Sequence, residues 1–203
     1  MKTSILVIVL ALSACSGSND PAANPEPATP DNEVVTAPES ENEKTPEVTR
    51  PQTETFDLMT GEGNQSHTAT LHQGEAFSLY VFEKFDFDAA KGRLFLSSNP
   101  EYNVDIEALP ANYDLAKLET AGKEELKEFG EVSDYSGELV EHPLGSAEIY
   151  LQVSSGEGIH DYIVWKSETG EAFLFRLHNP KNEESSDFAD AVFVSLSTVQ
   201  SDS

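Results

Sequence analysis

Short stretches of alternating apolar and polar residues recur along the second half of the chain. In residues 104–108 the apolar side chains of Val104, Ile106 and Ala108 alternate with Asp105 and Glu107 before the chain meets a proline. This period of two is typical of a half-buried strand. Further short strands are predicted at residues 66–71, 76–82, 93–97, 131–135, 138–142 and 147–153.

Two segments instead repeat their apolar residues at the three- and four-residue spacing of a helix. Residues 114–129 are predicted to form one, with Gly130 just past its end. Its stripe consists of Leu115, Leu118, Gly122, Leu126 and Phe129. A second stripe consists of Phe188, Ala191, Val192, Ser195, Leu196 and Val199, behind the capping candidates Ser185, Ser186 and Asp187. The pattern therefore predicts strands followed by two helices.

A pair of strands with apolar residues on both faces is predicted near the C-terminus. Residues 161–165 and 172–177 flank a short polar turn, which favours a hairpin with Gly170 in a positive-φ conformation. Because both faces of these strands are apolar, both must be covered. The last helix is expected to supply one of the covers.

The net charge of the chain limits the kinds of molecule that it is expected to bind. The chain of 203 residues carries 37 acidic and 12 basic side chains, a net charge of −25. Phosphate binding requires clustered Lys and Arg, so nucleic acid and anionic lipid headgroups are excluded as expected partners. Residues 55–203, taken as the single folded domain, retain 28 of the acidic and 9 of the basic residues. The folded part itself is therefore acidic.

The N-terminal quarter of the chain has a different composition. Residues 16–54 contain seven prolines and nine acidic residues but few large apolar side chains. Such a segment buries too little apolar surface to offset its conformational entropy, so residues 15–54 are predicted to be a disordered acidic linker that begins with Cys15.

The lone cysteine lies between this linker and an apolar run at residues 5–12 that follows Lys2. That arrangement is typical of a secretory signal peptide, and the apolar run is too short to cross a bilayer. Leu12-Ser13-Ala14-Cys15 resembles the lipobox of bacterial lipoproteins. The resemblance implies that residues 1–14 are removed and that Cys15 carries a diacylglyceryl group. The alternative is an ordinary leader with an incidental cysteine, cut at a nearby small-x-small site such as Ala14-x-Ser16. A cut just before Cys15 would place bulky Leu12 at the third residue upstream, which such sites disfavour.

The order of the predicted elements resembles the PsbP-like family. The points of resemblance are the strand at 104–109, the helix after it, the paired strands around Gly170, and a final helix ending near Val199. The resemblance implies an α+β fold in which a single domain has a curved, mostly antiparallel sheet covered by helices. It also implies a binding or accessory module without enzymatic activity.

The sequence matches catalytic and metal-binding motifs poorly. Asp86 and Asp88 could begin a calcium loop, but Lys91 occupies the position of its invariant glycine and Ser97 that of its glutamate. The five histidines lack metal-ligand spacing: His67, His72, His142, His160 and His178. His160 and Asp161 could belong to a hydrolytic triad, but no nucleophile motif accompanies them. No cofactor is expected, and the sequence does not settle whether a metal binds.

Together these patterns predict a lipid-anchored protein that faces outside the cytoplasm. Its anchor is Cys15, its partners are the membrane and an envelope protein, and its domain is a non-enzymatic binding module. Two alternatives stay open: a weak cation- or ligand-binding sensor, and a small envelope hydrolase.

Overall fold

The structure, a computed structural model, describes residues 50–60, 63–137, 143–144, 146–167 and 169–202. The chain divides into two units, Met1–Pro46 and Glu47–Ser203, and every described residue belongs to the second. The lipobox, most of the linker and the strand expected at residues 138–142 therefore lie outside the described residues.

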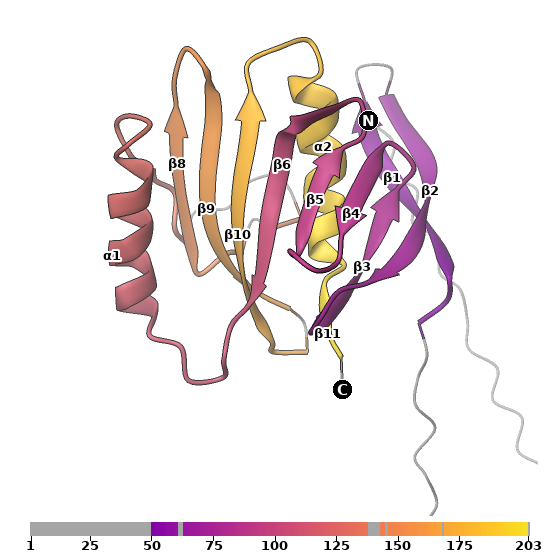
Figure 1. Ribbon diagram of the computed structural model, residues 1–203, viewed down its shortest axis with the longest axis horizontal. Coiled ribbons are helices and arrows are strands. Elements are labelled where there is room, and N and C mark those ends of the chain that lie inside the picture. The colour runs from indigo at the N-terminus through magenta and orange to yellow at the C-terminus, as the bar shows by residue number, and fades with distance from the viewer. Residues whose placement is uncertain (1–49, 61–62, 138–142, 145, 168, 203) are drawn as a thin grey trace, which may run out of the picture. The chain divides into compact units, whose positions relative to one another are not determined.

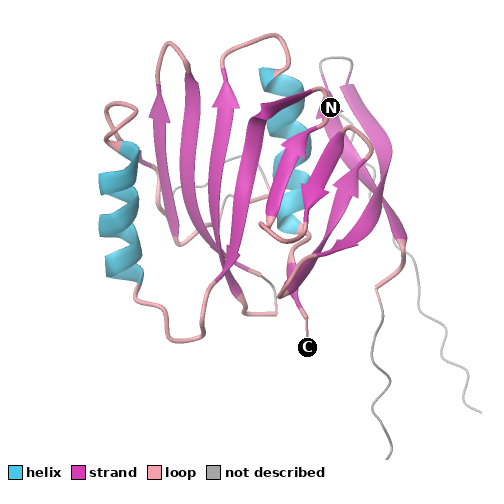
Figure 2. Cartoon of the chain, viewed as in Figure 1, coloured by secondary structure: helices cyan, strands magenta, loops and turns pink. Residues whose placement is uncertain are grey.

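The described strands form two antiparallel sheets (Figures 1 and 2). The larger has the order β4-β5-β6-β10-β9-β8-β7. Its strands are β4 (Phe85–Asp88), β5 (Arg93–Leu96), β6 (Asn99–Ala108), β7 (Ser133–Asp134), β8 (Ile149–Ser154), β9 (Gly158–Lys166) and β10 (Ala172–Pro180). The smaller has the order β1-β2-β3-β11. Its strands are β1 (Thr53–Thr60), β2 (Gly63–Gln73), β3 (Phe77–Phe82) and β11 (Gln200–Ser201).

The two described helices occupy different environments. Helix α2 (Ser185–Ser197) packs against β1 and β3 of the small sheet and against β10 of the large one, so it lies between the sheets. Helix α1 (Leu115–Leu126) packs on the other face of the large sheet, mainly over β8 and β9. Figure 1 shows α1 beside β8 and α2 behind the central strands.

The expected fold class is wrong. Strands hold 49% of the described residues and helices only 17%, so the fold is mostly β, and its large sheet is not covered by helices. The reason lies in β1 to β3, which bring a second sheet to the far side of α2. Leu58 of β1 is buried there, and every residue of β3 is buried. A sheet thus provides the cover that helices were expected to provide.

Several predicted elements are confirmed, although α1 ends at Leu126 and not at the predicted Phe129. Helix α1 begins after Asp114, whose side chain accepts a hydrogen bond from the Lys117 backbone N–H at 3.2 Å. The predicted hairpin is formed by β9 and β10, which pair Lys166 with Ala172, and Gly170 in its turn has the expected positive φ, 93°. Helix α2 follows Glu184, and none of the expected side-chain caps is used. Strands β1, β4 and β11 were not expected from the sequence.

The buried side chains form two clusters, one on each face of the large sheet. The larger lies around α2 and includes Phe188, whose ring is 5.4 Å from that of Tyr102 and 5.8 Å from that of Phe85. The smaller lies beneath α1 and includes Leu126 and Tyr162. Helix α1 approaches the sheet closely at Gly122, where a Cβ atom would lie 2.6 Å from the Tyr162 ring.

The first described residue is held beside the end of the domain. The Arg50 guanidinium donates to the Ser78 carbonyl at 3.1 Å and to the Thr198 carbonyl at 2.8 Å. It also lies 4.6 Å from the centre of the Tyr80 ring, within range of a cation–π interaction. These contacts join the start of the described chain to β3 and to the residue after α2.

Candidate functional site

The residues singled out from the sequence are mostly not brought together. Cys15 and His142 lie outside the described residues. Asp86 and Asp88 lie on strand β4 and not in a loop, which removes the geometry of an EF-hand. The Asp88 carboxylate instead forms an ion pair with Lys91 at 3.1 Å.

His160 and Asp161 lie on opposite faces of the large sheet, because successive residues of a strand alternate. The Asp161 side chain is buried in the face toward α2 and accepts a hydrogen bond from Gln152 Nε2 at 2.8 Å. Burial disfavours its charged form and raises the pKa of Asp161 to about 7. The two side chains therefore cannot act as one catalytic pair.

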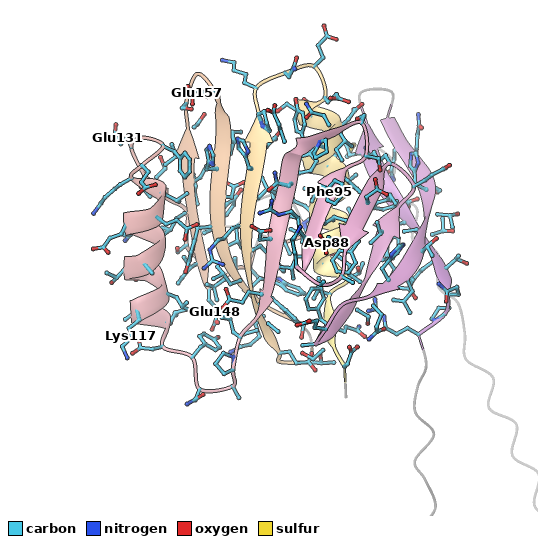
Figure 3. All side chains as sticks on the ribbon, viewed as in Figure 1. Asp88, Phe95, Lys117, Glu131, Glu148 and Glu157 are labelled. Carbon is cyan, nitrogen blue, oxygen red and sulfur yellow. The ribbon has the colours of Figure 1, made fainter. Side chains whose placement is uncertain are left out.

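The large sheet presents a polar surface beside α1. Helix α1 packs mainly on β8 and β9 and reaches β10, where Leu174 is buried in the cluster beneath the helix and Arg176 pairs with Glu125. Within the described part of the chain no helix packs on this face of β6, β5 and β4. We call this surface the open face. Its residues are Asp86, Asp88, Arg93, Phe95, Asn103, Asp105, Glu107, Arg176 and His178. Figure 3 labels Phe95 and Asp88 on β5 and β4.

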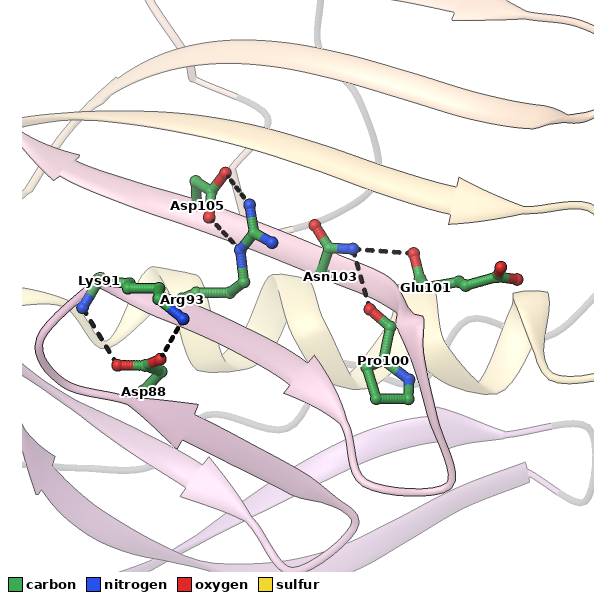
Figure 4. A network of polar contacts seen from close by, with 7 residues as sticks. All are labelled: Asp88, Lys91, Arg93, Pro100, Glu101, Asn103 and Asp105. Carbon is green, nitrogen blue, oxygen red and sulfur yellow. Dashed lines mark hydrogen bonds and ion pairs between the residues drawn. The ribbon is translucent and has the colours of Figure 1, made fainter.

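One row of the open face runs across four strands with alternating charge. The register places Asp88 beside Arg93, Arg93 beside Asp105, and Asp105 beside Arg176. Arg93 donates through Nε and Nη2 to the two oxygens of Asp105, at 2.5 and 2.6 Å (Figure 4). We call these four residues the charged row.

Each charge of this row has a partner. Arg176 lies 2.9 Å from a Glu107 oxygen and 3.1 Å from a Glu125 oxygen of α1. The hydrogen bond from Lys91 lowers the pKa of Asp88, and the hydrogen bond to Asp105 raises that of Arg93. Cross-strand pairs of opposite charge stabilise a sheet, so the charged row is primarily structural.

The next row of the same face carries rings. Its register pairs Phe95 with Asn103, Asn103 with His178, and His178 with His160. The imidazole rings stack with centroids 4.4 Å apart, and the Phe129 ring stacks on His160 at 3.7 Å. We call Phe95, Asn103, His178 and His160, with Phe129, the ring row.

The ring row is neither buried nor fully exposed. Phe129 is 43% exposed, and the other four side chains are half-buried. Partial burial and the adjacent His178 lower the pKa of His160, which favours the neutral imidazole. The Asn103 amide donates to the carbonyls of Pro100 and Glu101, at 3.1 and 2.9 Å (Figure 4). The row therefore offers ring surface beside charges that are already paired.

Sequence analysis treated these histidines as scattered, but the hairpin register brings two of them together. Paired residues of β9 and β10 are equidistant from the turn, so the pairing of Lys166 with Ala172 also pairs His160 with His178. Counting outward from the predicted turn at Gly170 would have revealed this pair. Asn103 and Phe95 could not be placed in the same way, because their strands join the hairpin through long-range pairing.

Metal ligands and free hydroxyl nucleophiles are the groups that the fold could offer a reaction, but among the described residues the former do not cluster and the hydroxyls beside Trp165 are already bonded. They contain no group of three or more His, Cys, Asp or Glu placed to hold a metal ion. A cavity of about 320 Å³ beside Trp165 is lined by the hydroxyls of Ser167, Thr169 and Ser197. Ser167 and Thr169 donate to the Glu171 carboxylate, and Ser197 donates to the Val194 carbonyl. These hydroxyls are thus engaged in local turns.

Most of the described domain is similar to one protein family. Residues 50–200 match the model of the family described as "Domain of unknown function (DUF8580)". The chain belongs to this family. The DUF8580 segment contains both helices, the open face and all the strands except the last residue of β11. No curated protein matches the chain. Separately, no helix among the described residues is long and apolar enough to cross a membrane.

Proposed function

We propose that this protein is an extracytoplasmic lipoprotein, anchored by acyl chains on Cys15, whose domain binds an envelope protein without catalysing a reaction. The lipobox-like Leu12-Ser13-Ala14-Cys15 supports the anchor. The binding role is carried over from the resemblance of the order of the predicted elements to PsbP-like modules, whose implied fold class is wrong for this chain.

The ring row beside the charged row is the observation that carries the binding role. A protein that covers the open face gains apolar contact with Phe129 and Phe95. It does not have to leave Arg93 or Asp105 unpaired, because each already has its partner on the sheet. Covering an unpaired charge costs several kcal/mol, and covering a paired one costs less, so the open face is suited to a macromolecular contact.

The anchor is tested in cells that produce the full chain. Cys15→Ala is expected to release the protein into the medium or to leave it unprocessed, because no residue can then accept the acyl chains. Fractionation and mass spectrometry measure this, and Ser16→Ala serves as the matched control. A Cys15→Ala protein that is processed normally and stays with the membrane contradicts the anchor.

The binding role is tested by photo-crosslinking from defined positions of the full chain in cells. A photoreactive amino acid at Phe95 is expected to crosslink one reproducible envelope protein. The same amino acid at Lys117, which is 84% exposed on α1 and away from the open face, is the control and is expected not to crosslink it. Absence of any reproducible product from Phe95 contradicts the proposal. So does an equal product from both positions.

A further inference from the structure

Among the four edge strands of the two sheets in the described part of the chain, only one is long. The edge strands β4, β7 and β11 have four, two and two residues, whereas β1 has eight. Short edge strands, Lys, Pro and bulges are the means by which proteins prevent unwanted strand pairing. Strand β1 contains neither Lys nor Pro, and its eight consecutive pairs with β2 show no bulge.

The free edge of β1 displays backbone groups at regular intervals. The Leu71 N–H donates to the Gln52 carbonyl at 2.8 Å, so the even-numbered residues of this strand bond to β2. The odd-numbered residues then direct their N–H and C=O groups outward. They are Thr53, Thr55, Asp57 and Met59. No described residue bonds to these outward groups.

The side chains of β1 define what can pair there. Asp57 and the exposed Met59 lie on the outer face of the strand, whereas the half-buried Phe56 and buried Leu58 lie on the inner one. Strands β1 and β2 contain Glu54 and Asp57 but no Lys or Arg. A second copy of the chain would bring a further net charge of −25 to this edge, whereas a basic strand would find opposite charge.

We infer that β1 accepts an extended strand from a partner protein, in which basic residues alternate with apolar ones. Added to the edge, such a strand forms backbone hydrogen bonds with the outward groups of β1. Its basic side chains lie beside Asp57, and its apolar side chains extend the face of Phe56 and Leu58. The inference rests on the proposed binding role and identifies an edge separate from the open face.

The test is amide hydrogen exchange of the full chain with a blocked peptide of alternating Lys and Val, about as long as β1. The outward amides of Thr55, Asp57 and Met59 are expected to exchange about tenfold more slowly when the peptide saturates the protein. The inward amides of Phe56 and Leu58, which bond to β2, are expected to be unchanged. A peptide of alternating Glu and Val is the charge control and is expected to give no protection.

Two pairs of variants isolate the edge. Thr55→Pro removes an outward N–H that β2 does not use, so the hairpin is retained and the peptide's protection is lost. Thr55→Val keeps the N–H and is expected to bind as the parent does. Asp57→Lys leaves the backbone intact and is expected to weaken the Lys peptide about tenfold while admitting the Glu peptide. This variant keeps the test decisive if Thr55→Pro fails to fold.

Three results would overturn the inference. The first is no protection by the Lys peptide, and the second is a concentration dependence of protection in Asp57→Lys that equals that of the parent. The third is protection that appears without peptide and grows with protein concentration, which shows that a second copy occupies the edge. If the crosslink from Phe95 persists while the peptide fails, only the edge inference fails and the binding role stands. If the peptide protects while the crosslink is absent, the open face is refuted and the edge stands.

Discussion

The two described helices differ in how much of the core packs against them. Helix α2 buries Phe188, Ala191, Val192, Ser195 and Leu196 between two sheets, whereas α1 buries only Gly122 and Leu126 against one. The large cluster around α2 includes side chains from both sheets, and the small cluster beneath α1 includes none from the small sheet. The domain is therefore organised around a helix enclosed by strands, and α1 stabilises one side of it.

The largest expected loss of stability comes from truncating a side chain of α2 at the centre of the core. Phe188→Ala removes a fully buried ring that contacts Phe85 and Tyr102, and should cost about 3–5 kcal/mol of unfolding free energy. Denaturant unfolding, followed by the emission of the only tryptophan, Trp165, measures the loss. Hydrogen exchange should accelerate in both sheets.

Leu126→Ala provides the comparison on the other helix. The residue is 3% exposed, and its truncation should cost about 2 kcal/mol because it leaves a smaller void. Exchange should accelerate in α1, β8 and β9 but not in the small sheet. If both variants loosen the small sheet equally, the contrast between the helices is wrong.

The next prediction concerns the pH dependence of stability that the buried Asp161 of β9 causes. Asp161 is buried on the α2 side, and its folded-state pKa of about 7 lies above its ordinary value of 3.8. Between these values the unfolded chain loses its proton while the folded one retains it, so folding becomes less favourable as the pH rises. Asp161→Asn avoids this cost and keeps the bond from Gln152. It should stabilise the protein at pH 8 by at most about 4 kcal/mol, and not at all below pH 4.

Asp88→Asn on the open face gives the opposite trend. Its lowered pKa means that the carboxylate stabilises the folded state above the unfolded pKa and that this contribution disappears as the pH falls. Urea unfolding from pH 2 to pH 8 compares the two variants, because the contribution of Asp88 is lost only below its ordinary pKa of 3.8. Parallel pH profiles for Asp161→Asn and the parent would show that Asp161 is already charged when folded.

The smallest effect concerns how closely α1 approaches the sheet. Gly122→Ala places a methyl group 2.6 Å from the Tyr162 ring and should cost about 1–3 kcal/mol, because the helix must shift outward. Gly156→Ala is the matched control, since a Cβ there meets nothing within 4 Å, and it should be nearly neutral. Thermal unfolding measures both, and equal melting temperatures for the two variants would contradict the close approach.

The sequence was sufficient to predict those elements that a local pattern of residues defines. Asp114 marked the start of α1, and Gly170 marked the turn of the hairpin. It was insufficient for β1, where threonine and acidic residues surround Phe56 and Leu58 and conceal a strand that is buried on one face only. The fold class was expected from the resemblance to the PsbP-like family, and it was wrong because it did not include the second sheet to which β1 belongs.

In the candidate site, too, local pairing could be predicted from the sequence and long-range pairing could not. The His160–His178 pair follows from a hairpin register that the sequence contains. The charged row does not, because Arg93 and Asp105 meet Arg176 only when β6 pairs with β10, across more than 60 residues of chain. Long-range pairing of this kind depends on tertiary packing, which no local pattern encodes.

The contacts of Arg50 have a mechanical consequence. Tension on the chain upstream of this residue passes through its guanidinium to Ser78 and Thr198, which belong to the interior of the small sheet and the end of α2. These hydrogen bonds are separate from those between β1 and β2, so they hold the start of the hairpin in addition to its own ladder. Arg50 therefore acts as a clamp that helps keep β1 in register with β2.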